Sequence, residues 1–139
     1  MAAPGEAQLI EAKAEAWPLA KPFVIARGAK TEAHVVVARV SGGGHNGRGE
    51  AVPYARYGES VDDAVKALNG LRGPLTRARL PALLPAGAAR NALDCALWDL
   101  EAKQAGKRAL ELAGLAPPQA ALTCSTLSLG EPAQMAADA

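Results

Sequence analysis

The sequence predicts an α+β fold, in which three strands come first and helices then cover one face of an antiparallel sheet. Three observations lead to this prediction. Residues 8–17 alternate between apolar and charged side chains, residues 33–40 form a valine-rich apolar run, and residues 88–106 carry apolar side chains at helical spacing. Strand patterns precede helical patterns over most of the chain, which is typical of segregated sheet and helix layers.

The first strand is expected to bury one face. Residues 8–17 place one set of side chains on the buried side (Ile10, Ala12, Ala14 and Ala16) and a charged set on the other (Glu11, Lys13 and Glu15). Residues 33–40 form the second strand, and the glycines of residues 42–47 turn the chain into a short third strand. No helix opens after these glycines, so they indicate a hairpin turn and not a phosphate-binding loop.

Helices are predicted from capping signals and apolar stripes. Ser60 and Asp63 form a capping box before the stripe Val61, Ala64, Val65, Leu68 and Leu71, which Gly73 and Pro74 would end. A link punctuated by Pro81 and Pro85 leads to the long helix, which Gly106 stops. A last short helical segment follows at residues 108–114.

The pattern changes after residues 116–118. Residues 121–129 are expected to form a buried strand, and Pro132 opens a helix that is still in progress at residue 139. A strand followed by a helix start is the first half of a βα unit, which needs parallel neighbours. We therefore expect one domain over residues 1–118 and the beginning of a second, incomplete domain over residues 119–139.

Composition excludes several classes of function. The formal net charge is +1 and no Lys/Arg cluster is present, so nucleic-acid binding is not expected. The chain carries no apolar run of membrane-spanning length and no signal segment, which favours a cytoplasmic protein without membrane contact. Cys95 and Cys124 have no metal-like spacing and are expected to be small, buried side chains.

The ionisable residues of the long helix are interpreted as ion pairs. Arg90 and Asp94, and likewise Asp99 and Lys103, stand four residues apart, and this spacing favours pairing over acid–base chemistry by Asp94, Asp99 or Glu101. His34 and His45 lack the partners of a triad or a zinc site. Trp98 is expected in the core because of its helical spacing.

Two expected loops carry more apolar, aromatic and charged side chains than a simple chain reversal requires. Residues 20–33 carry Phe23, Val24, Ile25 and Arg27, a combination that can hold a carboxylate beside an apolar wall. Residues 49–60 hold both tyrosines of the chain, Tyr54 and Tyr57. If both loops leave the same end of the sheet they form a joint lid, and the alternative is that each folds back onto its own sheet.

Three separated segments carry a resemblance to a known family. They are GEAVPYARYGES, ARNALDCALWDLEAKQAGKRALELAG, and a T-x-x-T pattern followed by P-x-x-M. Together they resemble the N-terminal part of the enolase superfamily, in its muconate-lactonizing subgroup. The stretches WPLAKPFVIARG, PYARYGES and LPAGAARNALDCALWDLEAK look most like the dipeptide epimerases that act on L-Ala-D/L-Glu.

The resemblance implies a capping α+β domain over the open end of a (β/α) barrel, followed by the first strand and the start of the first helix of that barrel. It implies that Arg27 holds the distal carboxylate of a glutamyl residue. Phe23, Ile25, Tyr54 and Tyr57 would wall the pocket, and Thr126 would contact the substrate.

The implied activity is that of an isomerase, a magnesium-dependent epimerase of dipeptides such as Ala-Glu from cell-wall peptides, which moves the proton α to a carboxylate. The full-length protein is also a possible homo-oligomer. The family's K-x-K lysine pair, second lysine base and acidic metal ligands have no counterpart in these residues. We therefore assign no catalytic or metal residue here, expect the Mg²⁺ ligands in the missing barrel, and expect the chain by itself to be inactive.

Two alternatives stay open from the sequence. The first is another enzyme of the subgroup: muconate cycloisomerase, o-succinylbenzoate synthase or N-acylamino acid racemase. Arg27 favours the dipeptide epimerases, since a glutamyl carboxylate needs a cation. The second alternative is a non-catalytic cap or interaction module.

Overall fold

The computed structural model describes residues 6–26 and 28–139, which fall into two compact units. The sheet–helix unit comprises Met1–Glu15 and His34–Pro117, and the hairpin–tail unit comprises Ala16–Ala33 and Pro118–Ala139.

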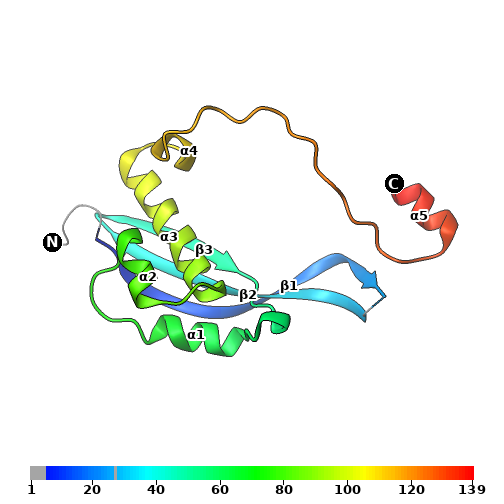
Figure 1. Ribbon diagram of the computed structural model, residues 1–139, viewed down its shortest axis with the longest axis horizontal. Helices are drawn as coiled ribbons and strands as arrows, with labels where there is room; N and C mark the ends of the chain where they lie inside the picture. The colour runs from blue at the N-terminus through cyan, green and yellow to red at the C-terminus, as the bar shows by residue number, and fades with distance from the viewer. Residues whose placement is uncertain (1–5, 27) are drawn as a thin grey trace. The chain divides into compact units, whose positions relative to one another are not determined.

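Three strands form one sheet in the order β1-β2-β3 (Figure 1). They are β1 (Gln8–Ile25), β2 (Gly28–Gly42) and β3 (His45–Ala51). β2 and β3 pair antiparallel, with Val36 opposite Ala51 and Gly42 opposite His45. Gly43 and Gly44 form the turn between them with φ of 55° and 80°, the left-handed conformations that a two-residue hairpin turn requires.

The helical elements begin and end close to their predicted signals. They are η1 (Ala55–Tyr57), α1 (Val61–Asn69), η2 (Arg77–Arg79), α2 (Leu80–Leu83), α3 (Ala88–Ala105), α4 (Ala109–Leu112) and α5 (Pro132–Asp138). Ser60 caps α1 as predicted, because its Oγ accepts a hydrogen bond from the Asp63 N–H at 3.1 Å. Gly106 ends α3 in the left-handed conformation. α1 ends at Asn69, earlier than the expected stop at Gly73.

The core of the sheet–helix unit lies between one face of the sheet and the helices (Figure 1). Val36, Ala38 and Val40 of β2 contribute to it from the sheet. α3 supplies the largest helical share, with Ala88, Ala92, Leu93, Ala96, Leu97 and Leu100. The three-stranded antiparallel sheet with helices on one face confirms the predicted α+β cap.

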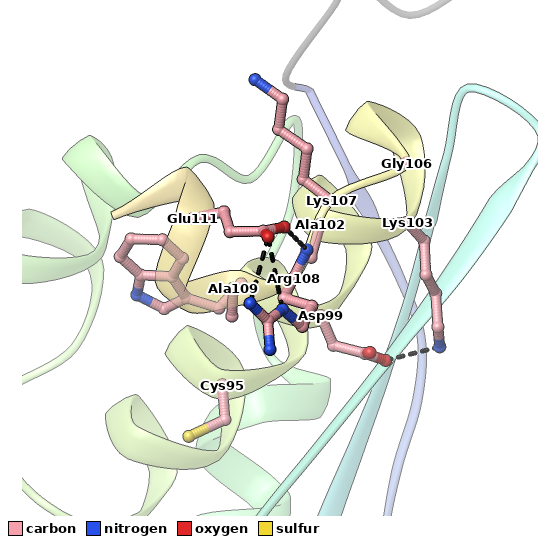
Figure 2. Close-up of a pocket in the computed structure, with 10 residues that line it drawn as sticks. Cys95, Asp99, Ala102, Lys103, Gly106, Lys107, Arg108, Ala109 and Glu111 are labelled. Carbon is pink, nitrogen blue, oxygen red and sulfur yellow. Dashed lines mark hydrogen bonds and ion pairs between the residues drawn. The ribbon is translucent and has the colours of Figure 1, made fainter. Parts of the chain in front are cut away.

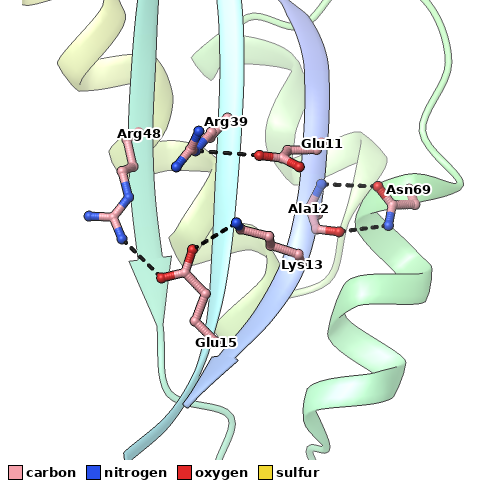
Figure 3. Close-up of polar contacts among 7 residues, drawn as sticks. All are labelled: Glu11, Ala12, Lys13, Glu15, Arg39, Arg48 and Asn69. Carbon is pink, nitrogen blue, oxygen red and sulfur yellow. Dashed lines mark hydrogen bonds and ion pairs between the residues drawn. The ribbon is translucent and has the colours of Figure 1, made fainter. Parts of the chain in front are cut away.

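The opposite face of the sheet is charged (Figure 3). Glu15 pairs with Lys13 at 3.3 Å and with Arg48 at 3.5 Å, and Glu11 pairs with Arg39 at 3.5 Å. These pairs join all three strands, as the predicted charged side of the first strand requires.

The buried side of β1 differs from the prediction at three of its four positions. Ala12 is buried as expected, whereas Ile10 is 54% exposed and Ala14 and Ala16 are also exposed. Ala7 and Leu9 contact the core at odd positions, and Ala12 does so at an even one. The alternation therefore shifts by one residue between Leu9 and Ala12, and Ile10 falls where the shift occurs.

The sequence suggests a long loop over residues 20–33. Residues 20–25 and 28–33 instead belong to the far ends of β1 and β2, which continue as a two-stranded ribbon. Pro18 and Pro22 lie within β1, although proline cannot donate a ladder hydrogen bond. β1 is an edge strand, and an edge position tolerates proline because one side of the strand needs no partner.

The tail of the hairpin–tail unit contains α5, as predicted, but residues 121–129 form no strand. Their expected parallel neighbours are absent from the described residues, so a regular ladder cannot form. One short pairing remains: the Leu129 N–H donates to the Val24 carbonyl at 2.9 Å. No helix in the described part of the chain is long and apolar enough to cross a membrane.

Candidate functional site

The tyrosine loop, residues 53–59, belongs to the sheet–helix unit and contains η1. The Tyr57 N–H donates to the Tyr54 carbonyl at 2.8 Å, and the Gly58 N–H donates to the Ala55 carbonyl at 3.0 Å. Gly58 has φ 74°, so the turn uses a conformation open mainly to glycine. The loop is therefore a defined turn with its own hydrogen bonds.

Both tyrosine rings are presented outward from this turn. Tyr54 is 43% exposed and Tyr57 is 77% exposed. Their ring centroids lie 5.8 Å apart with the planes tilted by 45°, a favourable arrangement for an aromatic pair. An exposed aromatic pair of this kind can provide an apolar wall for a small molecule.

Glu59 follows the tyrosines and connects the loop to α3. Its Oε2 accepts the Tyr54 N–H at 3.3 Å, and its Oε1 accepts the Ala88 N–H at 2.6 Å. The sequence interpretation assigned no role to Glu59, since its partner Ala88 is 29 residues away.

Phe23, Ile25 and Thr126 lie in the hairpin–tail unit. Alternation along β1 places Phe23 and Ile25 on one face of the strand, opposite Val24. Phe23 is half-buried and Ile25 is 36% exposed. Thr126 is exposed in the tail. Phe23 and Ile25 therefore form a small apolar face near the end of the hairpin.

Ser128 anchors the tail to the end of β1. Its Oγ accepts the Val24 N–H at 2.8 Å and donates to the Pro22 carbonyl at 3.2 Å. A pocket of about 380 Å³ lies beside these contacts, lined in part by Lys21, Val24 and Met135. Sequence reasoning missed Ser128, because nothing local to it reveals a partner about a hundred residues earlier.

The predicted site residues thus fall into two groups. Tyr54 and Tyr57 are brought together in one unit, and Phe23, Ile25 and Thr126 lie in the other. Arg27 lies outside the described residues. The joint lid formed by both loops remains a prediction.

An open groove of about 860 Å³ runs between α3 and α4 (Figure 2). Its charged side chains are largely paired: Lys103 contacts Asp99 at 2.7 Å, and Arg108 contacts Glu111 at 3.2 Å. Arg108 hydrogen bonds, first through its backbone N–H, lower the pKa of the Glu111 carboxyl. The Asp99–Lys103 pair confirms one of the two predicted helical ion pairs.

The second predicted pair is wrong. Arg90 donates to the Leu84 carbonyl at 3.5 Å, and no ion pair joins it to Asp94 within the described residues. The carbonyl at the end of the preceding short helix lies within reach of the guanidinium, so tertiary contact replaces the i, i+4 interaction.

Both cysteines are exposed, contrary to the prediction that they are buried. Cys95 borders the groove on α3, and its Cβ lies close to Gly49 of β3, at the margin of the helix–sheet contact. Partial desolvation raises the pKa of its thiol, and the carboxylates of Asp94 and Glu50 add to the effect. Cys124 belongs to the residues 121–129 that form no strand and therefore bury nothing.

No cluster of three or more His, Cys, Asp or Glu side chains that could hold a metal ion exists among residues 6–26 and 28–139. His34 and His45 lie exposed on β2 and β3.

Comparison with known proteins places the chain in a family. Residues 9–114 match the family model described as "Mandelate racemase / muconate lactonizing enzyme, N-terminal domain". The L-Ala-D/L-Glu epimerase of Escherichia coli K12 is 50% identical over 126 residues, a match covering 88% of this chain and 39% of that protein. An N-acetyl-D-glutamate racemase from Pseudoalteromonas is 44% identical over 96 residues, 64% of this chain and 30% of that protein.

Solved structures share the fold. An enolase family member from Agrobacterium tumefaciens, described as having homology to dipeptide epimerases and bound to sodium and L-Ala-L-Glu with an ordered loop, superposes with a TM-score of 0.79 and 43% identity. The match covers 96% of this chain and 41% of that one. Another match is a dipeptide epimerase from Cytophaga hutchinsonii complexed with Mg and a dipeptide, at 30% identity and a TM-score of 0.76.

The chain thus spans about two-fifths of the length of these relatives. The family match over residues 9–114 contains nearly all of the sheet, the helical elements from η1 to α4 and the tyrosine loop. The chain belongs to the mandelate racemase / muconate lactonizing enzyme family of the enolase superfamily, of which it carries the N-terminal domain.

Proposed function

We propose that this chain is the substrate-specificity cap of a dipeptide epimerase that acts on L-Ala-D/L-Glu. The observation that carries the proposal is the 43% identical solved relative that holds L-Ala-L-Glu and matches 96% of this chain. The 50% identical E. coli epimerase supports the same substrate class. The full-length protein would then be an isomerase that moves the proton α to a carboxylate.

The chain's own residues would bind and enclose the dipeptide. Tyr54 and Tyr57, and separately Phe23 and Ile25, supply apolar surface that can exclude water from the substrate. Arg27 would hold the distal carboxylate of the glutamyl residue in two-pronged fashion, and Thr126 would contact the dipeptide. These roles are carried over from the family resemblance onto the residues of this sequence.

Magnesium is the proposed cofactor of the full-length protein, in keeping with the metal in the Cytophaga hutchinsonii relative. The described residues do not fit a magnesium site, since none of their carboxylates and histidines form a cluster of three. A cytoplasmic location and a homo-oligomeric state are likewise predictions for the full-length protein.

The test is an exchange assay on the full-length protein. L-Ala-L-Glu is incubated in D₂O with and without Mg²⁺, and the loss of the glutamyl α-proton is followed by NMR. The expected result is magnesium-dependent exchange and formation of the D-glutamyl epimer. A folded full-length protein that leaves this proton in place would overturn the proposal.

A second candidate is racemisation of N-acyl-glutamate, favoured by the 44% identical N-acetyl-D-glutamate racemase. Both candidate substrates carry a distal carboxylate, so a cation at Arg27 would serve either. The ratio of kcat/KM for L-Ala-L-Glu and for N-acetyl-L-glutamate, measured on the same preparation, decides between them. If kcat/KM for L-Ala-L-Glu is lower than kcat/KM for N-acetyl-L-glutamate, the protein is an N-acyl-glutamate racemase and not a dipeptide epimerase.

Arg27 provides the sharpest prediction within the proposed site. Replacement by Met is expected to raise KM for L-Ala-L-Glu about 100-fold, because a desolvated carboxylate loses its charged partner. KM for L-Ala-L-Ala is expected to change little, since that dipeptide has no distal carboxylate. The matched control is Lys66→Met, which removes an exposed cation from α1. Equal losses for the two dipeptides would contradict the assigned role.

A further inference from the structure

Glu59 occupies an unusual position between two elements that are distant in sequence. One carboxylate oxygen accepts the Ala88 N–H at 2.6 Å, and the other accepts the Tyr54 N–H at 3.3 Å. Ala88 is the first residue of α3, whose first-turn N–H groups have no partner inside the helix. The positive end of the helix dipole adds to the attraction for a carboxylate there. Glu59 thus caps α3 from outside the helix.

The N-terminus of α3 is built so that this outside cap can reach it. The N-cap position is Gly87, which offers no side-chain hydrogen bond of its own. A Cβ built on Gly87 would lie 2.5 Å from Glu59 Oε1, so any side chain there would displace the carboxylate. Gly87 also has φ 152°, a conformation that favours glycine.

α3 is a firm support for the loop. It is 18 residues long, and its buried face forms much of the core against the sheet. The loop's internal hydrogen bonds shape the turn between Tyr54 and Gly58, but they do not fix where that turn lies. The two hydrogen bonds of Glu59 fix the position of the turn, because they join the Tyr54 backbone to the start of α3.

We propose that Glu59 is a positioning residue that docks the tyrosine loop onto α3, so that Tyr54 and Tyr57 meet the dipeptide in one arrangement. The proposal rests on the proposed function for its substrate, but the docking itself does not depend on it. Glu59 touches neither substrate nor metal in this role. It acts through the position of the two tyrosines.

The first experiment measures docking without any catalytic readout. Arg56 lies between the tyrosines, so trypsin cuts after Arg56 when the loop leaves α3, and mass spectrometry follows the cut in the full-length protein. Arg39 lies in β2, the central strand of the sheet, and is cut only when the sheet unfolds. The ratio of the two cleavage rates therefore separates loop release from global unfolding.

The variants are Glu59→Ala, Glu59→Gln and Gly87→Ala, with Asp62→Ala as the matched control. Asp62 is an exposed carboxylate three residues further on, in the first turn of α1. We expect the Arg56 rate relative to the Arg39 rate to rise about tenfold in Glu59→Ala and Gly87→Ala, the size typical of a lost N-cap. The ratio should rise less in Glu59→Gln, because the amide oxygen can still accept one N–H. It should not rise in Asp62→Ala.

The second experiment asks whether docking serves the substrate. For L-Ala-L-Glu, Glu59→Ala and Gly87→Ala should raise KM about tenfold while kcat stays within about twofold. This is the pattern expected when binding of substrate and transition state is lost equally. A merely destabilised protein would instead lose kcat in proportion to the unfolded fraction.

The outcomes are distinct. An unchanged Arg56-to-Arg39 ratio in all three variants would overturn the docking. A raised ratio with unchanged KM would overturn the positioning role and leave a structural cap. If the wild-type protein shows no epimerase activity, the proposed function fails, and the cleavage ratio alone then decides the docking.

Discussion

Arg77 shows how one side chain can overturn an expectation about its neighbour. Its guanidinium lies 3.6 Å from the ring centroid of Trp98 and also hydrogen-bonds Glu101, through Nε at 2.9 Å and through the terminal nitrogen at 2.7 Å. The hydrogen bond to Glu101 raises the pKa of Arg77, and partial burial opposes this. Trp98 was expected in the core, but it is only half-buried and pairs with a cation instead.

At the residue scale, we predict that Glu101→Gln lowers the free energy of unfolding by about 1–2 kcal/mol, because a two-pronged, partly buried charged hydrogen bond is lost. The measurement is urea unfolding followed by circular dichroism. Lys13→Ala, which removes the more exposed pair with Glu15, should change the value by less than about 0.5 kcal/mol. Equal effects of the two substitutions would show that the Arg77–Glu101 hydrogen bonds stabilise the fold no more than an exposed ion pair does.

The contact between β3 and α3 depends on two glycines. A Cβ built on Gly47 would overlap the Ala96 carbonyl oxygen, and one built on Gly49 would overlap the Ala92 carbonyl oxygen. The strand therefore lies directly against the helix backbone, with alanines on the helix side. The sequence showed these glycines only as neighbours of a turn, because the helix that approaches them begins about forty residues later.

At the scale of elements, Gly49→Ala is expected to cost about 1–3 kcal/mol of unfolding free energy, since the new methyl group forces the helix away from the sheet. Gly130→Ala is the control, because no atom lies within 4 Å of a Cβ built there. Its effect should stay within about 0.5 kcal/mol. The idea of a direct strand–helix contact fails if Gly49→Ala unfolds at the same urea concentration as the parent chain.

Each of the two compact units combines segments that are not consecutive in the sequence. The far half of the β1–β2 hairpin forms one unit with residues 118–139, and the remaining residues form the other. The hydrophobic core cluster lies wholly between Ala7 and Leu100 among the described residues. Its stability should therefore depend little on the tail.

At this scale, we predict that removing residues 119–139 from the 139-residue chain shifts its thermal unfolding midpoint by less than about 4 °C, the shift that about 1 kcal/mol would cause in a domain of this size. Near-ultraviolet circular dichroism should also keep its intensity, since Trp98 stays in place. Scanning calorimetry measures the midpoint. A fall of ten degrees or more would show that the tail contributes to the core after all.

The sequence by itself determined the elements whose signals are local. Ser60 and Asp63 mark the start of α1, Gly106 marks the end of α3, and Pro132 marks the start of α5, because caps and turns depend on residues within about four positions of each other. Three separated segments were also enough to indicate the family, since their order and spacing along the chain match the pattern of that family.

Only the tertiary structure decided which distant groups meet. It extended β1 past two prolines by placing it at the sheet edge, exposed Cys95 and half of Trp98, and brought Glu59 to Ala88 and Ser128 to Val24. These contacts join residues 29 to 104 positions apart, and no local pattern specifies such a partner. Whether a side chain is buried, paired or available to a substrate depends on packing between elements, and that packing exists only once the chain has folded.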